Sequence, residues 1–136
     1  MFEIKQLDHV VLRVRDVERM IAFYRDVLGC PVEKVQAELG LYQMRAGSSL
    51  IDLVPVDGAI GRRGGAAPGV EGRNLEHFCL QVAPFDAAEI IAHLRRHGCT
   101  PGEEVSRYGA DGQGPSIYVD DPEGNVVELK GPPYPG

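Results

Sequence analysis

The sequence predicts an α+β fold in which two tandem βαβββ modules form a cupped mixed sheet. The chain has 136 residues, the usual size of one domain. A short motif recurs halfway along the chain, and each copy precedes a helical pattern and then short β-like runs. We therefore expect a single domain over residues 1–136, with a first module at about 4–56, a linker at 57–73 and a second module at about 74–131.

The repeat joins residues 7–14 (LDHVVLRV) to residues 75–82 (LEHFCLQV), which share a leucine, an acid, a histidine, a leucine and a valine at matched positions. Each helical pattern that follows ends in Gly-Cys, at 29–30 and at 98–99. An aliphatic-acid-leucine triplet then occurs late in each half, around Asp52 and Glu128. This self-similarity indicates a tandem duplication.

The first half begins with a strand. Its alternation puts Val10, Leu12 and Val14 on one face, and His9, Val11 and Arg13 on the other. Asp16 is the expected N-cap of a helix with apolar positions at helical spacing up to Leu28, and Gly29 is its expected stop. Three β-like runs follow, at 32–35, 41–45 and 50–54.

The second half repeats this order. Asp86 with Glu89 three residues later resembles a capping box, and Gly98 is expected to end the helix. Strands are predicted at 116–119 and 125–130, joined by a type I turn at 121–124. We expect the glycine-rich segment 102–115 to be a loop, and it lacks the fingerprint of a phosphate-binding loop.

Composition narrows the class of partner. Hydrophobic residues make up 43% and charged residues 25% of the chain, as in ordinary globular proteins, and no apolar run is long enough to span a bilayer. The net charge of -6 argues against binding to nucleic acid. The first residues lack the pattern of a secretory signal, and the three cysteines show no CxxC spacing. We expect a cytoplasmic protein with reduced cysteines, whose partner is a small molecule rather than nucleic acid or a membrane.

The repeat also predicts a metal site. The polar face of each first strand carries a histidine and each last strand carries an acid, so a pseudo-two-fold arrangement would bring His9, Asp52, His77 and Glu128 around one point. Imidazole and carboxylate suit divalent ions such as Zn, Ni, Co, Fe(II) or Mn. A lone strand histidine is more often structural, but its repetition favours the ligand interpretation. The Asp52 side chain is one methylene shorter than that of Glu128, so the alternative that it orients a water stays open.

At these residues the sequence resembles the vicinal oxygen chelate superfamily, which includes glyoxalase I, fosfomycin-resistance thiol transferases, methylmalonyl-CoA epimerase, extradiol dioxygenases and metal-free bleomycin-binding proteins. The resemblance covers nearly the whole chain and rests on residues 8–14, 21–29, 76–78 and 120–129. It implies paired βαβββ modules, often in a homodimer. It also implies metal ligands at His9, Asp52, His77 and Glu128. Members of the superfamily with three ligands use only the positions of His9, His77 and Glu128.

The resemblance implies a metal-dependent lyase or isomerase of the lactoylglutathione lyase type, acting on an oxygen-chelating substrate such as a hemithioacetal. Glu128 is then the first choice of catalytic base and Asp52 the second. Arg13 matches a position that binds a glutathione carboxylate in glyoxalase I enzymes, and glutathione becomes a possible co-substrate. The family's asparagine contact near Asp52 is absent, because Pro55 and Val56 follow, which weakens glutathione specificity. Arg107 is a second candidate for binding an anionic group of the substrate.

Three alternative functions stay open within this resemblance. A thiol transferase acting on an epoxide antibiotic would use three ligands, but no lysine- or serine-rich loop for potassium and phosphonate is evident. An Fe(II) ring-cleaving dioxygenase would use His9, His77 and Glu128, but no additional histidine near the site is evident as an acid-base. A metal-free binding or resistance protein would have no need for the two histidines.

Overall fold

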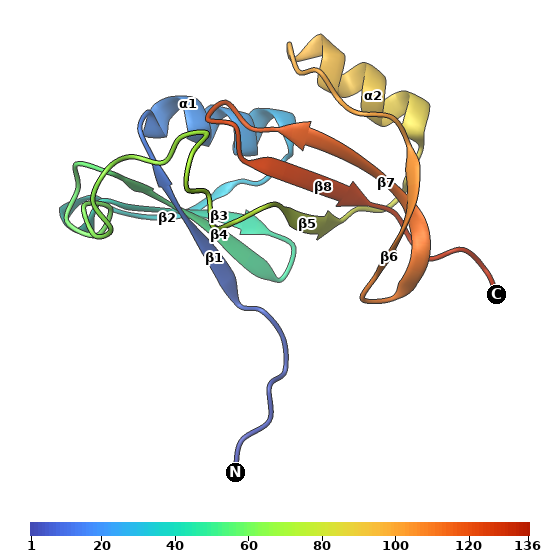
Figure 1. The fold of residues 1–136 in the computed structure, drawn as a ribbon, viewed down its shortest axis with the longest axis horizontal. Helices are drawn as coiled ribbons and strands as arrows, with labels where there is room; N and C mark the ends of the chain where they lie inside the picture. Colours follow the sequence, from blue (N-terminus) through green and yellow to red (C-terminus); the bar gives the residue numbers. More distant parts are fainter. The chain divides into compact units, whose positions relative to one another are not determined.

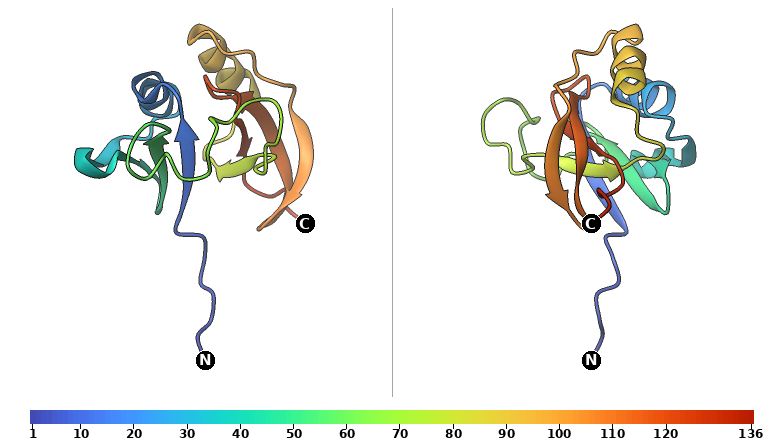
Figure 2. Two further views of the ribbon diagram at one scale, coloured as in Figure 1. Left: turned by 60° about the vertical axis from the view of Figure 1, so that its left-hand side comes forward. Right: turned by 90° about the vertical axis from the view of Figure 1, so that its right-hand side faces the viewer.

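The computed structural model describes residues 1–136 as two compact units, Met1–Glu71 and Gly72–Gly136. The boundary falls inside the glycine-rich segment expected as a linker. Each unit contains a four-stranded sheet and a helix that lies along it (Figures 1 and 2). No helix of the chain has the length and apolar character needed to cross a membrane.

The sheet of the first unit has the strand order β1-β4-β3-β2. Strand β1 (His9–Val14) pairs in parallel with β4 (Ser49–Pro55), whereas β3 (Leu41–Ala46) pairs antiparallel with both β4 and β2 (Val32–Gln36). The predicted alternation of β1 is confirmed, because Leu12 and Val14 are buried and His9 and Val11 are exposed.

The first helix begins as predicted and then changes form. Asp16 caps α1 (Val17–Ala22) by accepting a hydrogen bond from the Arg19 backbone N–H, and the helix continues as a π-helical turn, η1 (Phe23–Val27). Met20 and Ile21 of α1 and Tyr24 of η1 are buried. Gly29 follows with φ 74°, the left-handed conformation in which glycine commonly ends a helix. A short 3-10 helix, η2 (Ala37–Leu39), lies between β2 and β3.

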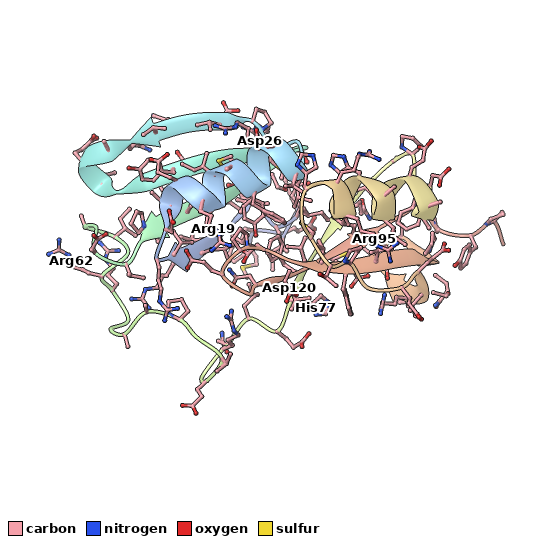
Figure 3. All side chains as sticks on the ribbon, turned by 90° about the horizontal axis from the view of Figure 1, so that it is seen from above. Arg19, Asp26, Arg62, His77, Arg95 and Asp120 are labelled. Atoms are coloured by element: carbon pink, nitrogen blue, oxygen red, sulfur yellow. The ribbon has the colours of Figure 1, made fainter.

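The second unit repeats the topology with the order β5-β8-β7-β6. Strand β5 (Phe78–Gln81) is parallel to β8 (Val126–Lys130), and β7 (Gly112–Asp120) is antiparallel to β8 and to β6 (Val105–Gly109). Helix α2 (Ala87–Arg96) is capped by Asp86, which accepts from the Glu89 N–H. Asp26 and Arg95, both exposed, mark the helical segments of the two units in Figure 3. Two βαβββ modules, and so an α+β fold with mixed sheets, are confirmed.

The prediction of a loop at 102–115 is wrong, because most of this segment forms the β6–β7 hairpin, with Gly109 paired to Gly112. Glycine inside a strand usually marks a close approach of another group rather than a loop. A Cβ atom on Gly109 would lie 2.8 Å from Cε of Lys130, so the side chain of β8 occupies the space that a larger residue would need.

The turn predicted at 121–124 is present. The Gly124 N–H donates to the Asp121 carbonyl at 3.0 Å, and the Asp121 carboxylate accepts from the backbone N–H groups of Glu123 and Asn125 at 2.9 Å each. This turn fixes where β8 begins, and therefore the register that pairs Glu128 with its neighbours.

Candidate metal centre

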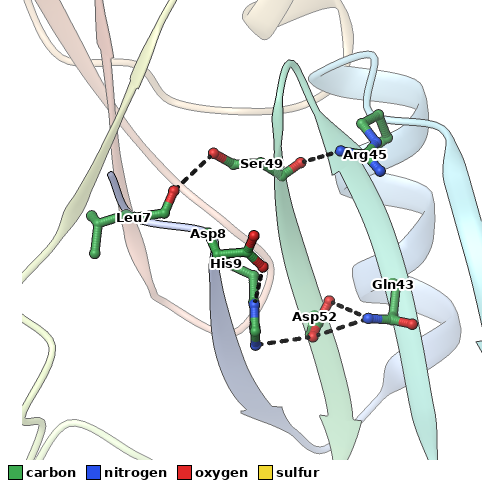
Figure 4. A network of polar contacts seen from close by, with 7 residues as sticks. All are labelled: Leu7, Asp8, His9, Gln43, Arg45, Ser49 and Asp52. Carbon is green, nitrogen blue, oxygen red and sulfur yellow. Dashed lines mark hydrogen bonds and ion pairs between the residues drawn. The ribbon is translucent and has the colours of Figure 1, made fainter. Parts of the chain in front are cut away.

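The first candidate pair is formed by His9 on β1 and Asp52 on β4 (Figure 4). Their strands are adjacent and parallel, and Val11 is in register with Asp52. His9 lies two residues before Val11 and so shares its face of the sheet, which brings the imidazole near the carboxylate. Nε2 of His9 lies 3.9 Å from Oδ2 of Asp52. The Asp52 side chain is buried, while that of His9 is 44% exposed. A partly exposed imidazole therefore lies beside a buried carboxylate.

Gln43 on β3 holds the Asp52 carboxylate from the other side. Its Nε2 donates to both Asp52 oxygens at 3.3 Å, and its own Oε1 accepts from Gln36 Nε2 at 3.2 Å. The antiparallel register places Gln43 directly opposite Asp52, which puts the two side chains on one face. This amide chain was not predicted, because register across β3 and β4 cannot be read from local sequence.

Asp8 fixes the other ring nitrogen of His9. Its Oδ2 lies 2.7 Å from Nδ1 (Figure 4). This hydrogen bond raises the pKa of His9 above its usual value of 6.5; desolvation opposes the shift, and the charges of Asp52 and Asp8 add to it. Nδ1 is committed to a carboxylate, so Nε2 is the nitrogen left to face Asp52.

The second pair repeats this geometry in the other unit. Nε2 of His77 lies 3.2 Å from Oε1 of Glu128, and Nδ1 of His77 lies 2.6 Å from Oε1 of Glu76. Glu128 is buried, at 6% exposure. In each half, the acid before the histidine therefore holds Nδ1 of that histidine. The sequence analysis assigned no role to these two acids, although their repetition at matched positions was a signal for one.

The donor atoms of each pair, an imidazole nitrogen and carboxylate oxygens, are of the kinds that divalent metals bind. Metal-binding histidines almost always donate their second ring nitrogen to a carboxylate or carbonyl, which fixes the tautomer and the ring orientation. Each pair here has that partner on Nδ1, with Nε2 directed at a buried carboxylate. The predicted ligands are thus brought together as two pairs, and no group of three or more His, Cys, Asp or Glu side chains has the geometry to hold an ion.

Tyr118 packs beside the second imidazole, and Arg107 stacks on Tyr118. Tyr118 is in register with Glu128, and its ring centroid lies 5.2 Å from that of His77 at a tilt of 53°. The guanidinium carbon of Arg107 lies 4.0 Å from the centroid of the Tyr118 ring, and Nη1 donates to Ser116 Oγ at 2.6 Å. Arg107 is therefore a strand residue of β6 that contacts Tyr118, not a loop residue as the sequence suggested.

Cys79 is also a neighbour of Glu128, with which it is in register on β5 and β8. Desolvation, the nearby Glu128 charge and a hydrogen bond to that carboxylate raise the pKa of its thiol to about 11, while Lys130 acts in the opposite direction. The three cysteines are all free, as expected. At neutral pH Cys79 is a protonated thiol beside the candidate base.

Arg13 lies on the same β1 face as His9, but its guanidinium contacts the chain itself. It donates to the backbone carbonyls of Gly61, Gly65 and Ala66, at 2.7, 2.5 and 3.0 Å. These three bonds hold the glycine-rich segment after β4 against β1. Its predicted role in binding a substrate carboxylate stays a prediction, whereas its role in ordering this segment is visible.

Comparison with known proteins matches residues 6–129 to the model of the Glyoxalase/Bleomycin resistance protein/Dioxygenase superfamily. The chain is 33% identical over 127 residues to the glyoxalase domain-containing protein RDO1 of Mycosarcoma maydis, covering 93% of this chain and 68% of that protein. It is 26% identical over 135 residues to the mitochondrial methylmalonyl-CoA epimerase of Mus musculus, covering 95% and 74%.

Among solved structures, the virulence protein STM3117 of Salmonella typhimurium superimposes with a TM-score of 0.78 at 25% identity, covering 96% of this chain and 99% of that one. The family match spans both histidine-carboxylate pairs and nearly all of both units. The chain therefore belongs to the Glyoxalase/Bleomycin resistance protein/Dioxygenase superfamily.

Proposed function

We propose that this chain is a metal-dependent lyase or isomerase that moves a proton at a carbon next to a carbonyl, on a small substrate that presents two neighbouring oxygens, such as a hemithioacetal. The observation that carries the proposal is the repeated acid-histidine-carboxylate arrangement. Its ligands are His9, Asp52, His77 and Glu128, and its ion is divalent Ni, Zn, Co, Fe or Mn. Similarity to an epimerase supports the isomerase class.

Coordination number sets a further requirement. Each pair supplies one imidazole and one carboxylate, whereas catalytic sites of this kind use at least three protein ligands and keep one position open. The proposed ion therefore needs both pairs, drawn from one chain or from two copies in a homodimer. When bound, the ion polarises the two substrate oxygens and stabilises negative charge on them.

The two carboxylates differ in how firmly they are held, which supports Glu128 as the base. Both oxygens of Asp52 accept from Gln43. Glu128 has Oε1 placed against the His77 ring, and it also accepts from the thiol of Cys79, which is a weak hydrogen-bond donor. Glu128 can therefore take the proton from one substrate carbon and return it to the adjacent carbon, which leaves the net protonation of the enzyme unchanged. Asp52 is the second candidate, and its fixed carboxylate is better suited to holding the ion.

Elemental analysis of the purified chain followed by isomerisation assays tests this function. We expect about one divalent ion bound, and turnover of the hemithioacetal of glutathione and methylglyoxal, or of an epimerisable acyl thioester. His77→Ala is expected to lose the ion. Glu128→Gln, which keeps the shape but removes the charge, is expected to lose turnover. His97→Ala is a matched control, because this exposed histidine lies at the end of α2, outside both pairs.

Other results would assign other members of the superfamily. A chain that binds no divalent ion but holds a small molecule would be a binding protein. Oxygen-dependent cleavage of a catechol with Fe(II), without isomerase activity, would make it a dioxygenase. Unchanged metal content in both His77→Ala and Glu128→Gln would show that the ligand assignment is wrong.

A further inference from the structure

A pair of histidines outside the candidate metal centre lies at the carboxyl end of helix α2. His93 is in the last turn of the helix, and His97 is the residue that caps it. The centroids of the two imidazole rings are 4.7 Å apart, and the ring planes are tilted by 56°. His97 is exposed and His93 is partly exposed, so both rings can be reached from solvent.

The helix backbone holds the two rings at this separation. Side chains four residues apart lie one above the other on one face of an α-helix. This relation persists at the end of α2, because the His97 backbone N–H still donates to the His93 carbonyl, at 3.3 Å. Leu94, next to His93, is 1% exposed and anchors this turn in the core. The spacing of the pair is therefore built into regular structure and needs no loop to close.

Two neutral imidazoles at this spacing form a chelating pair for a transition metal ion. Imidazole is a good ligand for Zn, Cu and Ni, and histidines four residues apart on a helix supply two of the zinc ligands in the HExxH motif. Around α2 no further His, Cys, Asp or Glu side chain completes a group of three. Water would therefore fill the remaining positions, and the ion would exchange with the solution.

The charges near the pair permit a bound cation. Glu89 lies one turn before His93 and Arg96 lies three residues after it, and both side chains are exposed, so water screens them. Arg95 lies two residues from each histidine, and residues at that spacing do not face each other on a helix. The carboxyl end of a helix carries partial negative charge, which favours a cation there.

This pair is separate from the candidate metal centre. Among the predicted ligands of the second unit, His77 directly precedes β5 and Glu128 lies on β8, whereas α2 carries none of them. An ion on α2 has two protein ligands, fewer than the three or more that the proposed centre needs, and is held more weakly. A dialysed chain would lose this ion and keep that of the centre, so His97→Ala still serves as a control for the centre.

We propose that His93 and His97 form a second metal site, on the surface of the second unit, that binds divalent transition metal ions through both imidazoles. Among the first-row divalent ions, Cu²⁺ should bind most tightly, because the affinity of nitrogen ligands rises from Mn to Cu and falls again at Zn. With excess metal, the chain would then hold one ion more than the centre accounts for.

Titration of the metal-free chain with Cu²⁺ alone tests the proposal without any catalysis. The ring signals of the four histidines are followed by NMR, because paramagnetic Cu²⁺ broadens the signals of the residues that bind it. We expect the rings of His93 and His97 to broaden together and saturably. In His93→Gln, binding at His97 should be at least about tenfold weaker, because one imidazole then acts without its neighbour.

Exchange of residues 95 and 97 is the sharper variant. Arg95→His combined with His97→Arg keeps the composition and the net charge, but it sets the two histidines two residues apart, where they do not face each other. Both positions are exposed, so the core is unaltered. This double variant should bind Cu²⁺ at α2 as weakly as His93→Gln.

Two results would overturn the proposal. One is equal Cu²⁺ affinity at α2 in the double variant and the unaltered chain. The other is broadening of the two rings at different Cu²⁺ concentrations in the unaltered chain, since each histidine would then bind by itself. In His77→Ala the α2 pair should bind Cu²⁺ as in the unaltered chain, so failure of the centre and failure of the pair give different results.

Discussion

Replacing Glu76 by glutamine tests whether the acid before each histidine acts on the metal through the imidazole. Glu76 Oε1 lies 2.6 Å from Nδ1 of His77. Glutamine retains an oxygen that can accept this hydrogen bond, so the substitution removes the charge while keeping the shape. The expected result is a weaker affinity for a divalent ion with no change in fold.

The magnitude follows from the exposure of the carboxylate. Loss of a carboxylate partner behind a metal-binding histidine typically costs about 10- to 100-fold in affinity. The Glu76 side chain is 88% exposed, so water screens its charge. The loss of metal affinity should therefore lie near the lower end of this range. We expect about a tenfold rise in the dissociation constant, equivalent to about 1.4 kcal/mol. Glu76→Ala also removes the hydrogen bond that orients the His77 ring, so it should lower the metal affinity further.

The measurement is a competition titration of Zn²⁺ between the metal-free chain and a chromophoric chelator at fixed pH. Glu104→Gln is the control, because it removes one exposed acid from the same unit without touching His77. If Glu76→Gln binds as tightly as the unaltered chain while His77→Ala loses the ion, the acid does not support the ligand, and the repeated motif needs another explanation.

Three more outcomes are expected. Asp8→Asn should lower the pKa of His9 toward 6.5, because it removes the largest cause of the raised pKa, and an NMR titration measures this change. The raised pKa of His9 in the folded state stabilises the metal-free chain below pH 6.5, and this stabilisation is lost as the pH rises through the folded-state pKa. Cys79 should react slowly with iodoacetamide at pH 8, because a pKa of about 11 instead of 9.0 leaves about a hundredfold less thiolate, and Glu128→Gln should speed the reaction. Leu53→Ala should lower the free energy of unfolding by about 2–5 kcal/mol in urea titrations, because Leu53 is completely buried, whereas the partly exposed Leu39→Ala should cost far less.

The duplication could be read from the sequence because it is local. The repeated motif placed His9 and His77 at equivalent points, and the alternation through Val14 gave the exact bounds of β1. The helix caps Asp16 and Asp86 were equally predictable, since a cap depends on residues three positions away. These features depend on neighbours within one turn or one strand.

The partners of the site residues required the tertiary structure. Gln43 meets Asp52, and Tyr118 meets Glu128, only because antiparallel registers align separate strands. The β6–β7 hairpin was missed for the same reason, since its glycines make room for Lys130 from another strand. Local sequence determines which residues a strand carries and which face they share. Which side chains then touch, and so which charges are neutralised, depends on pairing between segments distant in sequence.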